Sequence, residues 1–175
     1  MTDRSQIEAL LRNAYAARKR GDLAAILDAF AENPHFELAG APQASPVAIR
    51  ATEGGAFRSL MTGLIKTFEF LDHEIISMII EGNKAAVHWR SRMRSGVTGD
   101  EVVTEIVDLV TVEGGKITSF IEFCDTALAA RMVPADGRKR PAAALSRVDL
   151  PQPVGPTRAT NSPGATARSI ACTAR

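Results

Sequence analysis

The 175 residues contain only two cysteines, Cys124 and Cys172, and only three histidines. Two cysteines are too few for a disulfide framework or a cysteine metal site, and the histidines lack the His-x-x-x-His spacing of paired metal ligands. No metal is therefore expected. The phosphate-cradling and nucleophile-elbow motifs are also missing, so no cofactor is expected either.

Long apolar runs are absent as well. None approaches the ~20 residues that span a bilayer, and the opening MTDRSQIEALL lacks the basic and apolar regions of an export signal. We therefore expect no membrane association and a cytoplasmic location. Hydrophobic residues make up 45% of the chain and charged residues 23%, which is typical of a soluble globular domain. The length suffices for one domain with a real core.

Charge is divided unevenly along the chain. Residues 1–130 carry 13 Lys and Arg against 18 Asp and Glu, whereas residues 131–175 carry eight against two. A nucleic-acid-binding domain would normally present a basic face, so the acidic body argues against a nucleic-acid partner.

The end of the chain is a different kind of polypeptide. From residue 131 onward it holds six of the nine prolines and no Phe, Trp or Tyr. A segment so poor in large apolar groups cannot offset the entropy of its own ordering. We predict a folded domain over residues 1–131 and a disordered basic tail over 132–175. The tail has the composition of a GC-rich gene read out of frame, and a basic arm for an acidic partner is the alternative interpretation.

Helical patterns occupy the first third of the sequence. Ser5 and Glu8 have the spacing of a capping box, and Gly21 ends the first helix before Asp22 caps a second, which Asn33 and Pro34 stop. A third helix is predicted over residues 52–67. Arg18 in the first helix is expected to lie in water. Apolar residues recur at helical spacing in that helix, and these residues are Ile7, Leu10, Leu11, Ala14 and Ala17.

Strand patterns follow the helices. The segment HFELAG predicts a short strand before the third helix, and four β-rich segments after it are separated by Gly-bearing turns: HEIISMII, KAAVHWRSRMR, VVTEIVDLVTV and ITSFIEFCDTALAA. Closely spaced strands of this kind predict an antiparallel meander. The fold class is therefore α+β, a curved antiparallel sheet with three N-terminal helices that cover one face.

The order of these elements resembles the SnoaL-like branch of the nuclear-transport-factor-2-like superfamily. The resemblance runs from about residue 5 to 131 and rests on GDLAAILDAFAENPHFELAG early and EGGKITSFIEFCDTALAA late. It implies a cone-shaped sheet with a cavity between the sheet and the first helices, and it implies a homodimer. Members of this superfamily share no single chemistry.

Ketosteroid isomerase is one relative within that superfamily. Its general-base aspartate has no counterpart here, because the matching position is Leu38. The resemblance places Ala14, with Tyr15 beside it, at the helix position that holds the oxyanion, and Asp108 at the aspartate on the meander. Proton abstraction by that enzyme's mechanism is therefore not supported.

Limonene epoxide hydrolase is a second relative, in which an arginine lies between two aspartates. The matching positions in this sequence are Arg90, Arg92 and Glu122, and the water-positioning pair falls on Phe36 and Leu38. One acid is thus replaced by a cation, which argues against epoxide hydrolysis. For the Asp/His arrangement of SnoaL-type polyketide cyclases, Asp108 and His88 are the candidates.

Two acids are the candidate catalytic groups. Asp108 lies among apolar residues in EIVDLV, and Glu122 should share a strand face with Phe120 and Cys124. Desolvation would raise the pKa of either carboxyl group, as a general acid requires. Each acid could instead be a satisfied polar residue paired with an arginine or a backbone amide.

The stretch AVHWRSRMRS decides which side chains enter the cavity. At the two-residue period of a strand, Trp89 lies on one face while His88 and Arg90 lie on the other. Alternation favours Trp89 inside and the arginines at an interface, whereas the epoxide-hydrolase resemblance favours Arg90 inside, paired with Asp108 or Glu122. Only one of the two faces can be inside.

Two hypotheses follow for the function. In the first, a small hydrophobic molecule enters the cavity, and Asp108 and Glu122 polarise or protonate it in an isomerase- or cyclase-type reaction. In the second, the chain is a non-catalytic homodimeric binding or scaffold module with a vestigial pocket. The predicted ligand-binding residues are Tyr15, Phe36, Leu38, Trp89, Arg90 and Phe120.

Overall fold

The structure, a computed structural model, describes residues 3–40 and 48–133. The tail predicted over 132–175 lies outside the described residues from 134 onward. The helices are α1 (Arg4–Arg20), α2 (Leu23–Ala29), α3 (Gly54–Thr67) and α4 (Thr126–Met132). The strands are β1 (Phe30–Leu38), β2 (Ile49–Ala51), β3 (Phe68–Phe70), β4 (Glu74–Glu81), β5 (Lys84–Ser95), β6 (Glu101–Glu113) and β7 (Lys116–Phe123).

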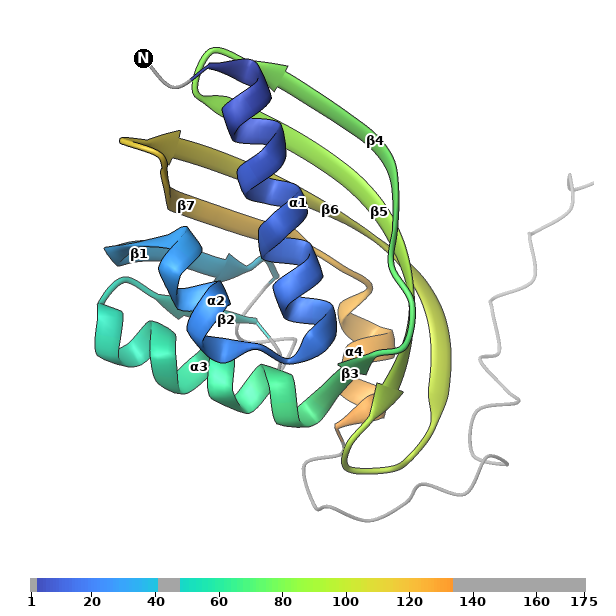
Figure 1. The fold of residues 1–175 in the computed structure, drawn as a ribbon. Helices are drawn as coiled ribbons and strands as arrows, with labels where there is room; N and C mark the ends of the chain where they lie inside the picture. Colours follow the sequence, from blue (N-terminus) through green and yellow to red (C-terminus); the bar gives the residue numbers. More distant parts are fainter. Residues whose placement is uncertain (1–2, 41–47, 134–175) are drawn as a thin grey trace, which may run out of the picture. The chain divides into compact units, whose positions relative to one another are not determined.

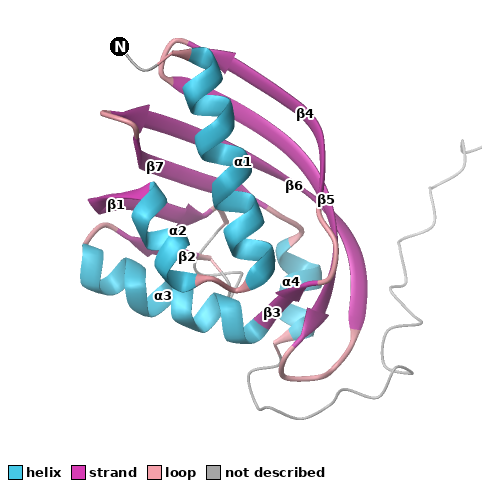
Figure 2. Ribbon diagram, in the orientation of Figure 1, coloured by secondary structure: helices cyan, strands magenta, loops and turns pink. Residues whose placement is uncertain are grey.

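The strands form one curled sheet in the order β2-β1-β7-β6-β5-β3, with β4 also paired to β5 (Figure 2). The predicted meander is confirmed as β4 to β7, whose neighbouring strands all pair antiparallel. The sheet as a whole is mixed, because one of its pairings, which the prediction of an antiparallel sheet did not include, is parallel. Strand β1 pairs parallel with β7. Parallel neighbours need a long connection, and here α3 and the rest of the meander connect the two strands.

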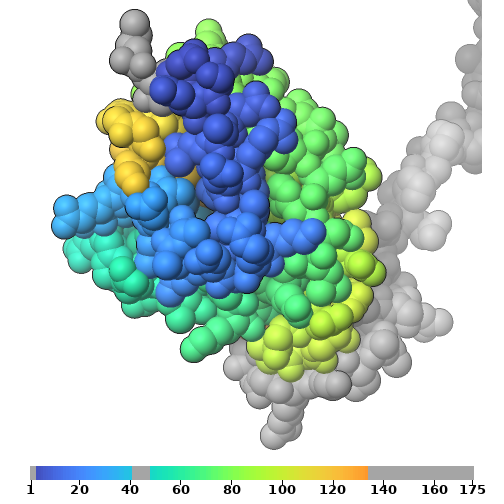
Figure 3. Space-filling model, in the orientation of Figure 1, coloured from blue at the N-terminus to red at the C-terminus, as the bar shows by residue number. Residues whose placement is uncertain are grey.

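The helices cover the concave side of the sheet (Figure 1). Helix α1 lies along this side with α2 against it, and the two pack together in the space-filling view (Figure 3). Ile7, Leu11 and Tyr15 are buried on one stripe of α1, which is the stripe that the apolar spacing predicts. They join a core that includes Phe57, Trp89 and Ile117. The α+β class with N-terminal helices over a curled sheet is thereby confirmed.

The ends of several elements differ from the predictions. Asp3, not Ser5, is the N-cap of α1, and it forms the capping box with Gln6. Helix α2 ends at Ala29 because Phe30 already has extended backbone and pairs with Ile117 of β7. Strand β1 is therefore longer than predicted, and the short strands β2 and β3 were not predicted at all.

A fourth helix replaces the end of the last predicted strand. Strand β7 ends at Phe123, and the Asp125 side chain accepts a hydrogen bond from the backbone N–H of Leu128, which caps α4. Met132, in the last turn, is 2% exposed. Met132 thus belongs to the hydrophobic core.

Candidate functional site

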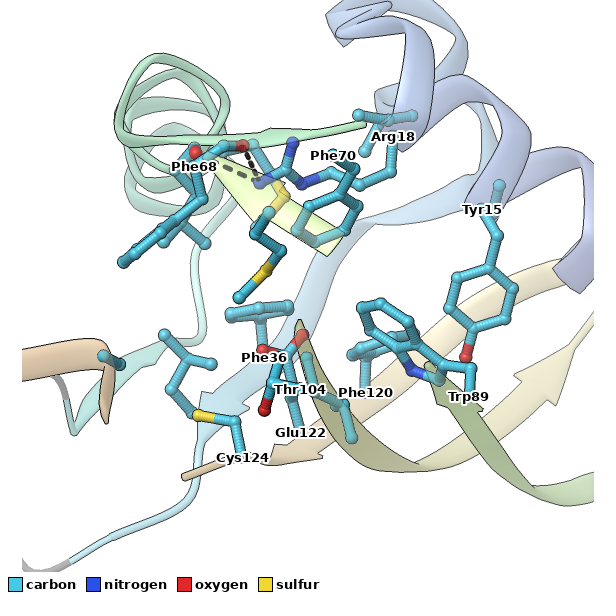
Figure 4. A pocket seen from close by; sticks show the side chains of 18 of the residues that line it. Tyr15, Arg18, Phe36, Phe68, Phe70, Trp89, Thr104, Phe120, Glu122 and Cys124 are labelled. Atoms are coloured by element: carbon cyan, nitrogen blue, oxygen red, sulfur yellow. Dashed lines mark hydrogen bonds between the residues drawn. The ribbon is translucent and has the colours of Figure 1, made fainter. Parts of the chain in front are cut away.

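A cavity of about 100 Å3 lies between the concave face of the sheet and helices α1, α2, α3 and α4. Its wall is mostly aliphatic and aromatic, and the few polar side chains in it come from α1, β6 and the end of β7 (Figure 4). Ligand pockets typically have this composition, although at ~300–1,000 Å3 many are larger. The apolar wall residues are Leu11, Ala14, Ile26, Phe30, Phe36, Leu38, Met61, Leu64, Phe68, Phe70, Trp89, Met93, Ile106, Phe120, Leu128 and Ala129.

Glu122 supplies a carboxyl group to this wall. The strand register places it beside Leu38 of β1 and opposite Asp108 of β6. Burial raises the pKa of Glu122 to about 7, although the positive charge of Arg18 lowers it. A carboxyl group with this pKa can both take up and release a proton near neutral pH, which suits general acid–base chemistry.

Asp108 lies behind the wall and does not line the cavity. Tyr15 Oη and Trp89 Nε1 each donate a hydrogen bond of 2.6 Å to its Oδ2 atom. The residue is fully buried, and its Oδ1 atom has no hydrogen-bond partner among the described residues. Burial raises the pKa of Asp108 well above its ordinary value, and the neighbouring charge of Glu122 raises it further. Its two donors, in contrast, line the cavity.

His73 completes the aromatic cluster around Asp108. Its ring centroid lies 4.9 Å from that of Tyr15 and 4.8 Å from that of Trp89. The side chain is half-buried, and burial lowers its pKa, with Lys19 adding to the effect. One edge of the His73 ring is enclosed, since its Nε2 atom is buried and has no hydrogen-bond partner among the described residues.

Arg18 is a second charged group in the wall. Its Nη2 atom donates to the carbonyl oxygens of Leu64 and Phe68, both at 3.0 Å, and its guanidinium carbon lies 4.2 Å from the centre of the Phe70 ring. Burial lowers the pKa of Arg18 to about 10, which still leaves it charged at neutral pH. None of the carboxylates in residues 3–40 and 48–133 forms a salt bridge with it.

Most of the ligand-binding residues predicted from the sequence do meet in the cavity. Tyr15, Phe36, Leu38, Trp89 and Phe120 all line it, together with Glu122. They come from α1 and three strands.

Arg90 was wrongly placed among them. It lies on the opposite face of β5 from Trp89, 49% of its side chain is exposed, and it forms a salt bridge of 2.6 Å with Glu105. Alternation explains this outcome: Val87, Trp89 and Met93 point inward, and an outward arginine retains its hydration. His88 also lies on the outer face and contacts Glu105 at 2.9 Å.

Sequence reasoning missed Arg18, which it left in water. The position follows Leu11, Ala14 and Tyr15 by seven, four and three residues, so helical spacing places it on the buried stripe. This signal was available in the sequence. Cys124, which the sequence places on the same strand face as Glu122, also lines the cavity, and burial raises the pKa of its thiol to about 12, which leaves it uncharged and unreactive at neutral pH.

Neither a metal centre nor a membrane span was found in the described part of the chain. No group of three or more His, Cys, Asp and Glu residues there could hold a metal ion. None of the helices there has both the length and the apolar character that crossing a membrane requires.

The family of SnoaL-like domains matches residues 11–120, and a comparison with curated proteins gives no match. Among solved structures, an NTF2-like protein of unknown function from Burkholderia pseudomallei has a TM-score of 0.64 at 18% identity, and the alignment covers 74% of this chain and 98% of that one. A proposed isomerase from Bacillus subtilis has a TM-score of 0.66 at 16% identity, with coverage of 75% and 95%. A proposed polyketide cyclase from Xanthomonas campestris has a TM-score of 0.58 at 17% identity, with coverage of 72% and 95%.

Proposed function

The chain belongs to the family of SnoaL-like domains, and we propose that it binds a compact, mostly apolar molecule in its cavity and exchanges a proton with it through Glu122. The observation that carries this proposal is the place of the Glu122 carboxyl group in a mostly apolar wall, where burial raises its pKa to about 7. An apolar wall disfavours the charged carboxylate and so raises the pKa of the carboxyl group. A pKa near 7 lets the group hold a proton and release it at neutral pH.

The geometry assigns different tasks to the two acids. Glu122 reaches the ligand space and is the proposed catalytic residue, whereas Asp108 is hydrogen-bonded to the Tyr15 and Trp89 side chains. Asp108 is thus a positioning residue that fixes the two rings against each other. The cavity of about 100 Å3 favours a ligand of one ring over a steroid or a fused polyketide.

Proton transfer next to a carbonyl group is the reaction type that fits these groups. A carboxylate at Glu122 would take a proton from the carbon beside the carbonyl and leave an enolate, and the acid formed would return the proton to the same carbon or, in a conjugated enolate, to the carbon two positions further along. Isomerisations and cyclisations both use this step, and two of the structural neighbours are proposed members of those enzyme classes. The step needs no cofactor, because the proton is the only particle that the protein gains or loses.

Exchange of hydrogen for deuterium tests the proposal without knowledge of the natural substrate. Cyclohexanone and 2-cyclohexenone are incubated with the protein in D2O at pH 7, and loss of the signals beside the carbonyl is followed by proton NMR. We expect saturable acceleration that Glu122→Gln reduces by about 100-fold or more, in the usual range for a lost acid–base group.

The matched control is Glu105→Gln, on the outer face, which should exchange as the unaltered chain does. Equal exchange by Glu122→Gln and the unaltered chain would refute the assigned role. Binding of both ketones with no accelerated exchange would instead favour the second candidate, a binding or scaffold module.

A specific observation supports that second candidate as a homodimer. The strand register places Ile79, Ala86, Leu109 and Ile121 in one row across β4, β5, β6 and β7, with Val107 and Phe123 beside it. Ile79 is 66% exposed and Phe123 is 49% exposed. An apolar row across four strands, flanked by the ion pairs of Arg90 and Arg94 with Glu105 and Glu101, suits a second copy of this chain.

A further inference from the structure

The cavity holds a guanidinium group that the proposed proton transfer does not use. Arg18 lies on the buried stripe of α1 and lines the ligand space. Its position is fixed by three contacts with α3 and β3: two carbonyl oxygens, of Leu64 and Phe68, and the ring of Phe70. A long side chain held in this way loses little further freedom when it binds a ligand.

The charge of Arg18 is incompletely compensated within the described residues. Both hydrogen bonds come from Nη2, and Nε and Nη1 donate to none of those residues. The positive charge of Arg18 also acts on Glu122 without forming a salt bridge, and it lowers the pKa of that carboxyl group. A buried cation without an adjacent anion is costly, and a planar guanidinium with free donors matches a carboxylate in both shape and charge.

We propose that the ligand is a compact apolar carboxylic acid whose carboxylate pairs with Arg18, so that its apolar part lies against the aromatic wall near Glu122. This inference rests on the proposed function and names its substrate class. The apolar wall supplies the hydrophobic contact, and Arg18 supplies the polar group that orients the ligand, as a few polar groups usually do in apolar pockets.

Glu122 would make binding of such an anion depend on pH. An anion beside Glu122 binds better when that carboxyl group is protonated, so binding should be accompanied by uptake of a proton at neutral pH. The positive charge of Arg18 attracts an anion, whereas ionised acids repel it. Several titratable groups face Glu122 or lie near it in the wall. They are Arg18 and Tyr15 from α1, Asp108 from β6, and Cys124 and Asp125 after β7.

The first test compares benzoate with benzamide, two molecules of nearly the same size that differ in charge. Binding to the full chain is measured by isothermal titration calorimetry at pH 6. We expect benzoate to bind at least tenfold more tightly than benzamide, and Arg18→Met to abolish this preference while changing benzamide affinity less than threefold. Arg12→Met is the matched control, because Arg12 is an exposed arginine of the same helix.

A preference for benzoate that survives Arg18→Met, or that Arg12→Met removes equally, would overturn the inference. Benzamide binding without a preference for benzoate would also overturn it and leave the proposed function standing. Failure of both molecules to bind the unaltered chain would count against the inference and the proposed function alike, because a one-ring ligand is what the cavity is proposed to accept.

The second test keeps the inference falsifiable if Arg18→Met does not fold. Benzoate is ionised throughout pH 6 to 9, since a carboxyl group has an ordinary pKa of about 4. In the unaltered chain its affinity should fall by up to tenfold per pH unit above about pH 7, where Glu122 ionises. In Glu122→Gln the affinity should stay level. An affinity of the unaltered chain that is independent of pH, or that rises with pH, contradicts the proposal.

Discussion

Replacing Glu122 with glutamine should stabilise the fold above neutral pH. Glutamine has nearly the same shape but cannot ionise, so the variant avoids placing a negative charge in the apolar wall. The folded chain raises the pKa of Glu122 from 4.5 to about 7. Each pH unit of such a difference corresponds to 1.36 kcal/mol, so ionisation of Glu122 costs the folded state about 3 kcal/mol at pH 8.

The sign of the pH dependence follows from which state holds the proton. Between pH 4.5 and about 7 the folded chain keeps the proton that the unfolded chain has lost, so stability falls as pH rises and levels off above that window. The variant lacks this loss. Its advantage over the unaltered chain should therefore increase by about 2.5 kcal/mol between pH 5 and pH 8.

Urea unfolding provides the measurement. Trp89 is the only tryptophan and is 1% exposed, so its fluorescence reports the loss of the core directly. Glu105→Gln is a control of opposite sign, because Arg90 and His88 lower the pKa of Glu105, so its removal should cost stability throughout the range above the ordinary pKa of 4.5, at pH 5 as well as at pH 8. An advantage of Glu122→Gln that is equal at pH 5 and pH 8, or a loss at pH 8, would refute the reasoning.

Three other substitutions test separate parts of the structure. Tyr15→Phe removes one of the two donors to Asp108 and should lower the free energy of unfolding by about 1–3 kcal/mol; thermal unfolding with no change would show that this bond contributes nothing. Phe36→Ala should cost about 3–5 kcal/mol and admit two-ring ligands that the unaltered chain rejects in calorimetry. Val107→Lys together with Leu109→Lys should convert a dimer into a monomer, and light scattering measures the molar mass. The free energy of unfolding per chain should fall by little more than the dimer contact contributes. An unchanged molar mass would exclude this face as the interface.

The sequence predicted the meander, and its alternation favoured the inward face that β5 has, although the resemblance to epoxide hydrolase left Arg90 as the alternative. Trp89 and Arg90 are adjacent and must point to opposite faces, so the burial of one fixes the exposure of the other. The parallel pairing of β1 with β7 could not be predicted in this way, since it joins strands more than 80 residues apart. Helix α4 was missed because CDTALAA has no Gly or Pro to mark the end of the strand, although Asp125 at its N-cap was a usable signal.

The candidate site was predictable only in part. Glu122 and the aromatic residues of the wall follow from strand periodicity, and Arg18 could have been found from its place on the stripe of α1. The depth of Asp108 could not, because it depends on two large rings from α1 and β5 closing over it. Periodicity says which face a residue occupies, whereas distance from the cavity depends on the packing of side chains from other elements.

The two acids differ because their surroundings differ, and this difference divides the chemistry. They lie opposite each other on β6 and β7, where both cannot readily be charged. Asp108 has two neutral donors and no cation nearby, whereas Glu122 has the field of Arg18. Glu122 is therefore the acid that ionises near neutral pH, and it is also the one that reaches the cavity. Arg18 lowers the pKa of Glu122 and is also the proposed anchor of a carboxylate. An anionic ligand bound at Arg18 would weaken the effect of the guanidinium charge and so raise the pKa of Glu122. Ligand binding would then be coupled to proton uptake at the same carboxyl group that performs the transfer.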